Sequence, residues 1–272
     1  MSEAVLNYFI YNENVYETKD FGKKYKAINP SVYEVIRIKD GKALFLEEHY
    51  ERFINSLKLA KSSLEIPISE IKKSINKLTE LNKISNYNVK IVFNNLNSNS
   101  INKYYFFIKT SYPTNEMYDE GIKTLTYNAI RENPHAKVIN QSLRDNVNAL
   151  LKEKDCYEAL YINDKNEITE GSRSNTFFLM GNKVYTAPAE DVLLGVTRQR
   201  IIRLCRENGI EVIEMPIKLN EINKFDAVFM SGTSPKVLPI KYIDDIKYDT
   251  KYPLLLKIMK IYDDEINNYL KK

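Results

Sequence analysis

The sequence predicts an α+β fold made of two lobes joined by a short linker. Its 272 residues suit one large domain or two modest ones, and 43% hydrophobic with 28% charged residues is ordinary for a globular chain. Segments with the two-residue period of strands alternate with segments of helical period. The stretch Ser-Tyr-Pro-Thr-Asn-Glu at 111–116 is typical of a linker. We therefore expect a small N-terminal domain at 1–110, a linker at 111–119 and a larger β-rich domain at 120–272.

The first lobe begins with short strands and contains one strong hairpin signal. Residues 32–39 alternate as a strand does, and Asp40-Gly41 then predicts a tight turn into a partner strand at 43–46. In the strand at 32–39, one face would be formed by Val32, Glu34, Ile36 and Ile38. Helical spacing predicts helices at 47–63 and 69–82. The other expected strands are 8–11, 15–18, 89–93 and 104–109.

The second lobe has more strands and three helices. The helix expected at 197–208 has Thr197 as its N-cap and Gly209 just past its end, and amphipathic patterns predict two further helices at 142–154 and 251–270. The expected strands are 121–127, 157–162, 167–170, 174–180, 183–186, 211–215, 225–230 and 237–240.

Composition excludes several classes of protein. The longest apolar runs fall far short of the roughly 18 residues that span a bilayer, and the N-terminus lacks a signal-peptide pattern. The net charge of +4 is small and its signs are interspersed, unlike the basic face of a nucleic-acid-binding protein. Two separated cysteines and two histidines offer no metal-ligand spacing. We expect a cytoplasmic protein without a metal, nucleic-acid or membrane partner.

Three turns of the second lobe combine glycine with hydroxyl residues. They are Glu170-Gly-Ser-Arg-Ser-Asn175, Leu194-Gly-Val-Thr-Arg198 and Met230-Ser-Gly-Thr-Ser234. A helix start with exposed N–H groups and a hydroxyl suits a phosphate. The chain has neither a GxGxxG nor a GxxxxGK[ST] motif, so we expect a cofactor with a single phosphate.

Lys137 is the candidate nucleophile. Its neighbours Ala136, Val138 and Ile139 are apolar and predict partial burial, and a buried amine loses proton affinity and becomes nucleophilic. Most lysines only solvate a surface, so this signal is weak by itself. An activated lysine, an acid at a strand end (Glu170) and a monophosphate site together indicate pyridoxal phosphate (PLP).

These residues, in this order and spacing, resemble the class IV PLP-dependent aminotransferases of fold type IV. That group contains branched-chain aminotransferases, D-amino acid transaminases and aminodeoxychorismate lyases. The resemblance covers about residues 8–240. It is carried by Lys137-x-x-Asn140, by the three turn motifs in sequence, and by His49-x-x-Arg52-Phe53 on the first-lobe helix.

The resemblance implies a fold-type-IV enzyme with its cofactor in the cleft between the lobes, and it implies residue roles. Lys137 would form the Schiff base and move the proton between substrate Cα and cofactor C4′, Glu170 would pair with the pyridinium nitrogen, and Arg52 would hold the phosphate. The other implied cofactor contacts are Ser174, Asn175, Gly195, Val196, Thr197, Thr233 and Ser234. The implied substrate contacts are Tyr33, Asn94 and Gly232. Tyr33 also fits a half-buried strand tyrosine, and Arg198, Arg203 and Arg206 fit the wet face of a helix.

The substrate pocket departs from each branch of the group. The D-amino acid branch carries an Arg-x-His pair for the substrate carboxylate where this chain reads Phe93-Asn-Asn-Leu96, and the Tyr-x-Arg pattern of branched-chain enzymes is absent too. Carboxylate recognition is therefore assigned to the turn at 232–234 or to asparagines.

Three functions remain open at this point. The favoured one is an aminotransferase that moves an amino group between an amino acid and a 2-oxo acid. The alternatives are a 4-amino-4-deoxychorismate lyase releasing pyruvate and a non-catalytic binding module. The resemblance further implies a homodimer.

Overall fold

The computed structural model describes residues 3–98, 100–130, 134–138 and 140–271, which form two compact units. Unit 1 consists of Met1–Ser111, Ala136–Ile139 and Ile266–Lys272, and unit 2 of Tyr112–His135 and Asn140–Glu265. The C-terminal helix α7 (Pro253–Lys271) contributes residues to both units.

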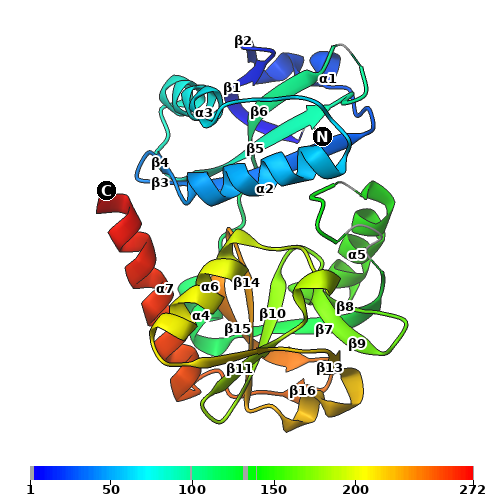
Figure 1. The fold of residues 1–272 in the computed structure, drawn as a ribbon, viewed down its shortest axis with the longest axis vertical. Coiled ribbons are helices and arrows are strands. Elements are labelled where there is room, and N and C mark those ends of the chain that lie inside the picture. Colours follow the sequence, from blue (N-terminus) through cyan, green and yellow to red (C-terminus); the bar gives the residue numbers. More distant parts are fainter. Residues whose placement is uncertain (1–2, 99, 131–133, 139, 272) are drawn as a thin grey trace. The chain divides into compact units, whose positions relative to one another are not determined.

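Unit 1 is an antiparallel sheet with two helices on one face (Figure 1). The strand order is β2-β1-β6-β5-β3-β4. The strands are β1 (Ala4–Tyr11), β2 (Asn14–Glu17), β3 (Ser31–Lys39), β4 (Lys42–Ala43), β5 (Tyr87–Asn94) and β6 (Asn102–Ile108). The helices are α2 (Leu46–Leu59) and α3 (Ile68–Asn82), besides the short η1 (Thr18–Asp20) and α1 (Phe21–Lys24).

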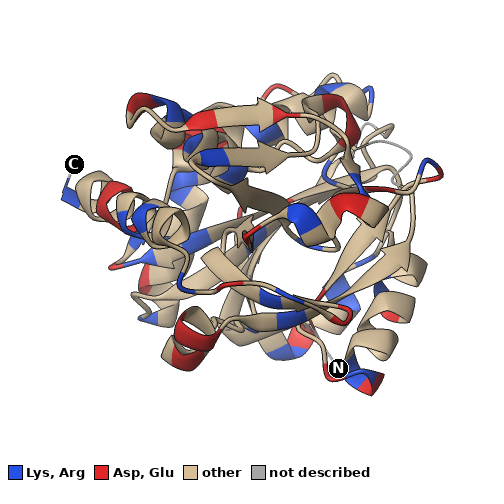
Figure 2. Cartoon of the chain, turned by 90° about the horizontal axis from the view of Figure 1, so that it is seen from below, with Lys and Arg blue, Asp and Glu red and all other residues tan. Residues whose placement is uncertain are grey.

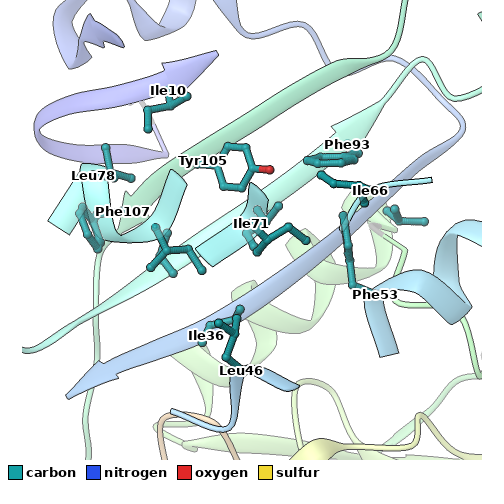
Figure 3. Close-up of a cluster of buried hydrophobic side chains, with 14 of the residues drawn as sticks. Ile10, Ile36, Leu46, Phe53, Ile66, Ile71, Leu78, Phe93, Tyr105 and Phe107 are labelled. Atoms are coloured by element: carbon teal, nitrogen blue, oxygen red, sulfur yellow. The ribbon is translucent and has the colours of Figure 1, made fainter. Parts of the chain in front are cut away.

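The main core of unit 1 lies between the sheet and these two helices (Figure 3). Phe53 of α2 meets Phe93 of β5 edge to face, with ring centroids 4.9 Å apart. Side chains of the opposite parity form a second, aromatic cluster on the other face of the sheet, with Tyr33, Tyr104 and Phe106 among its members. The sheet is thus buried on both faces, which is why hydrophobic residues follow one another without alternation at Ile91–Phe93 of β5.

The hairpin predicted at Asp40-Gly41 is confirmed. Both turn residues have positive φ, 51° and 77°, as a two-residue type I′ turn requires. The partner strand is shorter than expected, because β4 contains two residues only. Phe45 then takes a left-handed conformation, and α2 begins at Leu46.

The segment around Lys137 and the end of α7 were both expected in the second lobe, but they belong to unit 1. The backbone of Lys137 bonds to both β3 and α2 of unit 1, and the Tyr269 hydroxyl accepts from the Leu46 N–H. Local sequence could not show these contacts, because their partners lie far away along the chain. The stretch expected as a linker also contains a helix, α4 (Asn115–Glu120), whose N-cap Thr114 accepts a hydrogen bond from the Met117 N–H.

Unit 2 contains a ten-stranded mixed sheet that closes on itself. Its order is β12-β11-β10-β14-β15-β7-β8-β9-β13, the tenth strand β16 pairs with β15 off this path, and an additional pairing joins β10 to β9 at Asn175 and Glu170. The strands are β7 (Ile122–Asn128), β8 (Glu158–Ile162), β9 (Glu167–Gly171), β10 (Asn175–Met180), β11 (Lys183–Thr186), β12 (Glu211–Glu214), β13 (Ile217–Lys218), β14 (Ala227–Gly232), β15 (Lys236–Ile243) and β16 (Ile246–Lys247). Side chains from all six strands of the closed ring form one apolar cluster.

The helices of unit 2 besides α4 and α7 are α5 (Gln141–Glu153) and α6 (Val196–Glu207), with the 3₁₀ turns η2 (Ala189–Asp191) and η3 (Leu219–Lys224). The expected stop of α6 at Gly209 is confirmed by its φ of 69°. The expected N-cap is wrong: Gly195, not Thr197, precedes the first turn, and no side chain caps it.

Charged residues of both signs are interspersed along the ribbons of both units, as Figure 2 shows. Among the described helices, none is both long and apolar enough to cross a bilayer.

Candidate functional site

Lys137 is fixed to unit 1 through its backbone. Its N–H donates to Ser56 Oγ of α2 at 3.3 Å, and its carbonyl accepts from the Tyr33 N–H of β3 at 3.1 Å. The side chain is half-buried, and Nζ lies 4.9 Å from the centroid of the Tyr33 ring. The predicted partial burial is confirmed, although Val138 is exposed and Ile139 lies outside the described residues.

Arg52 forms a buried two-point ion pair with Glu34. Its Nε and Nη2 donate to the two oxygens of Glu34 at 3.0 and 2.5 Å. His49, one turn earlier on α2, places Nδ1 3.5 Å from the same carboxylate. The edge of the guanidinium that faces Glu34 is thus occupied, and any phosphate would have to bind Arg52 from another side.

The surroundings shift the pKa values of Glu34 and His49. Burial would raise the pKa of the Glu34 carboxyl, but the Arg52 charge and the His49 hydrogen bond hold that pKa well below its usual range. Burial lowers the pKa of His49, and the positive charges of Arg52 and Lys137 lower it further against the opposing effect of Glu34. The cluster therefore favours a carboxylate and a neutral imidazole.

Tyr33 and Asn94, the predicted substrate contacts of unit 1, differ in their surroundings. Tyr33 is nearly buried on the aromatic face of the sheet, with the Lys137 ammonium over its ring. The Asn94 amide donates to the Lys26 carbonyl at 2.6 Å and accepts from Asn102 at 2.9 Å. These bonds give Asn94 a structural role and lend no support to substrate binding by its side chain.

Glu170 and Asn175 both hydrogen-bond to the backbone of Leu193 in unit 2, and we call this pair of contacts the clamp. Glu170 Oε2 accepts from the Leu193 N–H at 3.1 Å, and Asn175 Nδ2 donates to the Leu193 carbonyl at 2.9 Å. Both side chains are buried where β9 pairs with β10. The clamp fixes the residues that lead into α6.

The N-terminus of α6 is the best phosphate candidate in unit 2. Gly195 precedes it without a side-chain cap, so the N–H groups of Val196 and Thr197 belong to the first turn, where helices leave such groups unsatisfied. A Cβ on Gly195 would lie 2.2 Å from Asn175 Oδ1, so only glycine fits beside the clamp. Tyr262 donates to the Thr197 hydroxyl at 3.4 Å.

Ser174 has a different partner from the predicted one. Its hydroxyl donates to the buried carboxylate of Glu158 at 3.1 Å, and Ser172 donates to the same carboxylate at 2.5 Å. The Arg173 N–H also bonds to it. Glu158 therefore holds the turn between Glu170 and Asn175 in shape, and Ser174 acts through that turn.

The third motif lies where β14 runs into β15. Gly232 ends β14, and a Cβ there would lie 3.1 Å from the Pro235 ring. Thr233 and Ser234 are half-buried in the turn that follows. The Ser231 hydroxyl is buried and makes no hydrogen bond within the described residues. An unsatisfied buried hydroxyl beside this turn fits a bound polar group.

Two residues near the predicted site were not singled out from the sequence. Glu34 lies on the face with Val32 and Ile36, and a carboxylate in an apolar stripe is the signal of a paired, buried charge. Lys90 interrupts an apolar strand in the same way. The expectation that Arg198 lies on a wet helix face is wrong, because Arg198 is buried against Glu214 and the Ala187 carbonyl.

The described residues thus form two groups, one in each unit. In unit 1 the structure brings together Lys137, Tyr33, Arg52, Glu34 and His49. In unit 2 it brings together Glu170, Asn175 and the start of α6. In the part of the chain that the structure describes, no three His, Cys, Asp or Glu side chains gather as a metal site requires.

The family model for amino-transferase class IV matches residues 31–243. This range is well over half of the chain, and it includes both groups of candidate residues. The chain therefore belongs to the class IV aminotransferase family.

Curated relatives come from two kinds of transaminase. The chain is 28% identical over 229 residues to D-alanine aminotransferase of Bacillus licheniformis, covering 78% of each protein. It is 26% identical over 227 residues to a putative branched-chain-amino-acid aminotransferase of Methanocaldococcus jannaschii, again covering 78% of each.

Solved structures share the fold at low sequence identity. A branched-chain aminotransferase from Thermoproteus uzoniensis superposes with a TM-score of 0.85 at 20% identity, covering 97% of this chain and 96% of that one. The PLP form of a Thermobaculum terrenum branched-chain aminotransferase gives 0.81 at 19%, covering 98% and 95%. A putative 4-amino-4-deoxychorismate lyase from Legionella pneumophila gives 0.78 at 20%, covering 89% and 97%.

The predicted fold class is confirmed by these likenesses. The predictions of a class IV transaminase acting on amino and 2-oxo acids, with PLP as its cofactor, are confirmed at the level of the family.

Proposed function

We propose that this chain is a PLP-dependent aminotransferase in which Lys137 carries the cofactor and both groups of candidate residues serve it. The observation that carries the proposal is the position in which the structure holds Lys137. Two backbone hydrogen bonds fix this residue against β3 and α2, so its amine lies over Tyr33 and within the electrostatic range of the Arg52–Glu34–His49 cluster.

PLP, when bound, supplies a Schiff base and an electron-accepting ring. The residues present suit its groups. The uncapped start of α6 and the guanidinium of Arg52 suit the phosphate dianion, and the buried Ser231 hydroxyl still lacks a partner among the described residues.

The residues then have the following roles in the proposal. Lys137 Nζ holds the cofactor and afterwards moves the proton between substrate Cα and C4′. Glu170 keeps the proton on the ring nitrogen, and its second contact, the Leu193 N–H, fixes the carboxylate in place. Arg52 and the N–H groups of Val196 and Thr197 bind the phosphate, with Thr233 and Ser234.

The test is a visible absorption spectrum of the purified protein during titration with L- and D-amino acids. We expect a yellow Schiff-base band that one amino acid bleaches to the pyridoxamine form. The bleaching donor identifies the stereochemistry, which the two kinds of relative leave open between D- and L-amino acids. A band that no amino acid bleaches would favour the lyase alternative, and the absence of a band after adding PLP would overturn the proposal.

A homodimer and a cytoplasmic location are part of the same proposal. They are supported by the resemblance to the family rather than by a contact or signal in this chain. Sedimentation equilibrium of the PLP-loaded protein tests the first, and microscopy of the tagged protein in its own cells tests the second. A monomeric, fully active enzyme would contradict the dimer.

A further inference from the structure

Tyr262 is a buried tyrosine of α7 that contacts the proposed phosphate site. Its side chain is 3% exposed, and its O–H donates to the Thr197 hydroxyl at 3.4 Å. Thr197 is 4% exposed and belongs to the first turn of α6. A phenylalanine at position 262 would fill the same space without the cost of removing a hydroxyl from water, so the hydroxyl calls for a reason.

The part of α7 around Tyr262 is bound to both segments of unit 2 that are proposed to hold the phosphate. Arg203 of α6 donates to Glu265 at 2.6 Å, and α7 lies beside α6 (Figure 1). Asp263 accepts at 2.6 Å from Lys236, which begins β15 directly after the third turn motif. Residues 262–265 thus attach α7 to the start of α6 and to the β14–β15 turn.

The contact with Tyr262 limits the direction in which the Thr197 hydroxyl can donate. A threonine hydroxyl has one proton to donate and two lone pairs that accept. The Tyr262 O–H occupies an accepting position of Thr197 Oγ1, so the proton of Thr197 must point away from Tyr262. The oxygens of a phosphate dianion only accept, so a hydroxyl can bind them only as a donor.

Tyr262 lies outside the range that identifies the family. The family model ends at residue 243, whereas α7 begins at Pro253. The phosphate contacts proposed above, from Arg52 to Ser234, all lie inside the matched range. A contribution of α7 to the phosphate site is therefore a property of this chain that the family match does not include.

We propose that Tyr262 is a positioning residue for cofactor binding, which holds the Thr197 hydroxyl as a donor to the phosphate of PLP. This inference rests on the proposed function, because it takes the start of α6 as the phosphate site. Tyr262 acts through Thr197 and does not itself bind the cofactor. The N–H groups of Val196 and Thr197 do not depend on this contact, so losing it weakens the site without abolishing it.

The experiment compares Tyr262→Phe, Thr197→Val and the double variant with the control Tyr248→Phe. Tyr248 is a matched control because it is also a buried tyrosine of unit 2, and its hydroxyl donates to the Ile222 carbonyl at 3.0 Å. Each full-length chain is freed of PLP. The Kd is then measured for PLP, for pyridoxal and for inorganic phosphate, and urea denaturation measures the stability of each variant.

We expect Thr197→Val to weaken the binding of PLP and of phosphate about 10- to 100-fold, the effect of losing one charged hydrogen bond. Tyr262→Phe should weaken both about 3- to 10-fold, because the Thr197 hydroxyl remains but is free to turn. Pyridoxal has no phosphate and should bind to every variant as to the wild type. In the Thr197→Val background, Tyr262→Phe should cause no further loss. Tyr248→Phe should change stability alone.

The inference is wrong if Tyr262→Phe binds PLP and phosphate as tightly as the wild type does. An equal loss of pyridoxal affinity would show a general structural role, and a full further loss in the double variant would show that Tyr262 does not act through Thr197. If Tyr262→Phe does not fold, Thr197→Val decides, because wild-type phosphate affinity in that variant overturns the inference. Failure of the proposed function is a separate result, since it removes the Schiff-base band from the wild-type enzyme itself.

Discussion

The two groups of candidate residues are stabilised in opposite ways. In unit 1, Arg52 and Glu34 form a buried ion pair whose charges compensate each other, and His49 lies beside the same carboxylate. In unit 2, Glu170 and Asn175 bind the backbone of Leu193 and hold a loop in place. The first group is stabilised by the compensation of buried charges, whereas the second fixes the position of a loop through hydrogen bonds.

This difference decides what a substitution does in each unit. Removing one member of a buried ion pair leaves an uncompensated charge and costs about 3–5 kcal/mol. Removing one hydrogen bond to a backbone group costs about 0.5–1.5 kcal/mol. The same kind of change should therefore affect folding in unit 1 and loop position in unit 2.

Lys137→Ala should have the largest effect on activity. We expect the Schiff-base band to disappear and kcat to fall at least about 10³-fold, because Lys137 is proposed both to hold the cofactor and to move the proton. The fold should persist, since Lys137 is fixed through its backbone N–H and C=O rather than through its amine. Absorption spectroscopy, assays and circular dichroism measure the three effects, with Lys103→Ala as the control. Wild-type turnover in Lys137→Ala would refute the central assignment.

Glu34→Gln should have the largest effect on stability. The neutral amide leaves the Arg52 guanidinium buried without its counter-charge, so we expect the free energy of unfolding of the PLP-free protein to fall by about 3–5 kcal/mol. Urea denaturation measures it. If Arg52 binds the phosphate as proposed, saturating PLP restores part of this loss.

Glu170→Gln is the matched control in unit 2. A glutamine oxygen can still accept from the Leu193 N–H, so stability should change by less than about 1 kcal/mol. Activity should fall instead, because a neutral amide no longer keeps the ring nitrogen protonated. Equal losses of unfolding free energy in Glu34→Gln and Glu170→Gln would contradict the proposed difference between the two groups.

Much of the fold followed from local pattern. The Asp40-Gly41 hairpin and helices such as α3 and α6 were predictable, because turn chemistry and apolar periodicity act over a few residues. The closure of the sheet through Asn175 and Glu170 was not predictable, since it joins strands through a register that their own residues do not encode. The docking of Lys137 on unit 1 is nonlocal in the same sense.

The site was predictable as a set of motifs but not as a set of contacts. Lys137, Arg52 and Glu170 were recognised by residue type and spacing. Glu34 was missed, although a carboxylate between Val32 and Ile36 on an apolar face was a readable signal. The role of Ser174 toward Glu158 had no such signal, because one hydroxyl in a turn can bind a cofactor or a neighbouring carboxylate equally well.

Gly195→Ala should damage the clamp of unit 2 by sterics alone. The new methyl group would lie 2.2 Å from Asn175 Oδ1, which Nδ2 holds in place by its bond to Leu193. We expect a loss of about 1–3 kcal/mol in unfolding free energy and weaker PLP binding, measured by denaturation and by cofactor titration.

Two further variants show whether the clamp is responsible. Asn175→Ala in the Gly195→Ala background removes the clash, so the two substitutions should be less harmful together than their sum. Gly22→Ala is the control, because a Cβ at this position of α1 meets nothing within 4 Å, and it should be neutral or slightly stabilising. Strictly additive effects of the first pair would show that Asn175 does not mediate the damage.

The smallest expected effect is a pH dependence that belongs to unit 1. Burial and the charges of Arg52 and Lys137 lower the pKa of His49, and this effect outweighs the opposing effect of Glu34. Below about pH 6.5, His49 therefore binds a proton in the unfolded chain but stays neutral in the folded protein. Stability is therefore full above that pH and falls as the pH drops toward the folded pKa, by at most about 1.4 kcal/mol per pH unit. The contribution of Glu34, whose pKa is also lowered, is present above about pH 4.3 and is lost only at lower pH.

Urea denaturation between about pH 7.5 and about pH 5.5 tests this pH dependence. As the pH falls, the free energy of unfolding should decrease less in His49→Gln than in the wild type. Identical slopes would mean that His49 titrates in the folded cluster as it does in water, and the description of this cluster as a balance of buried charge would have to exclude it.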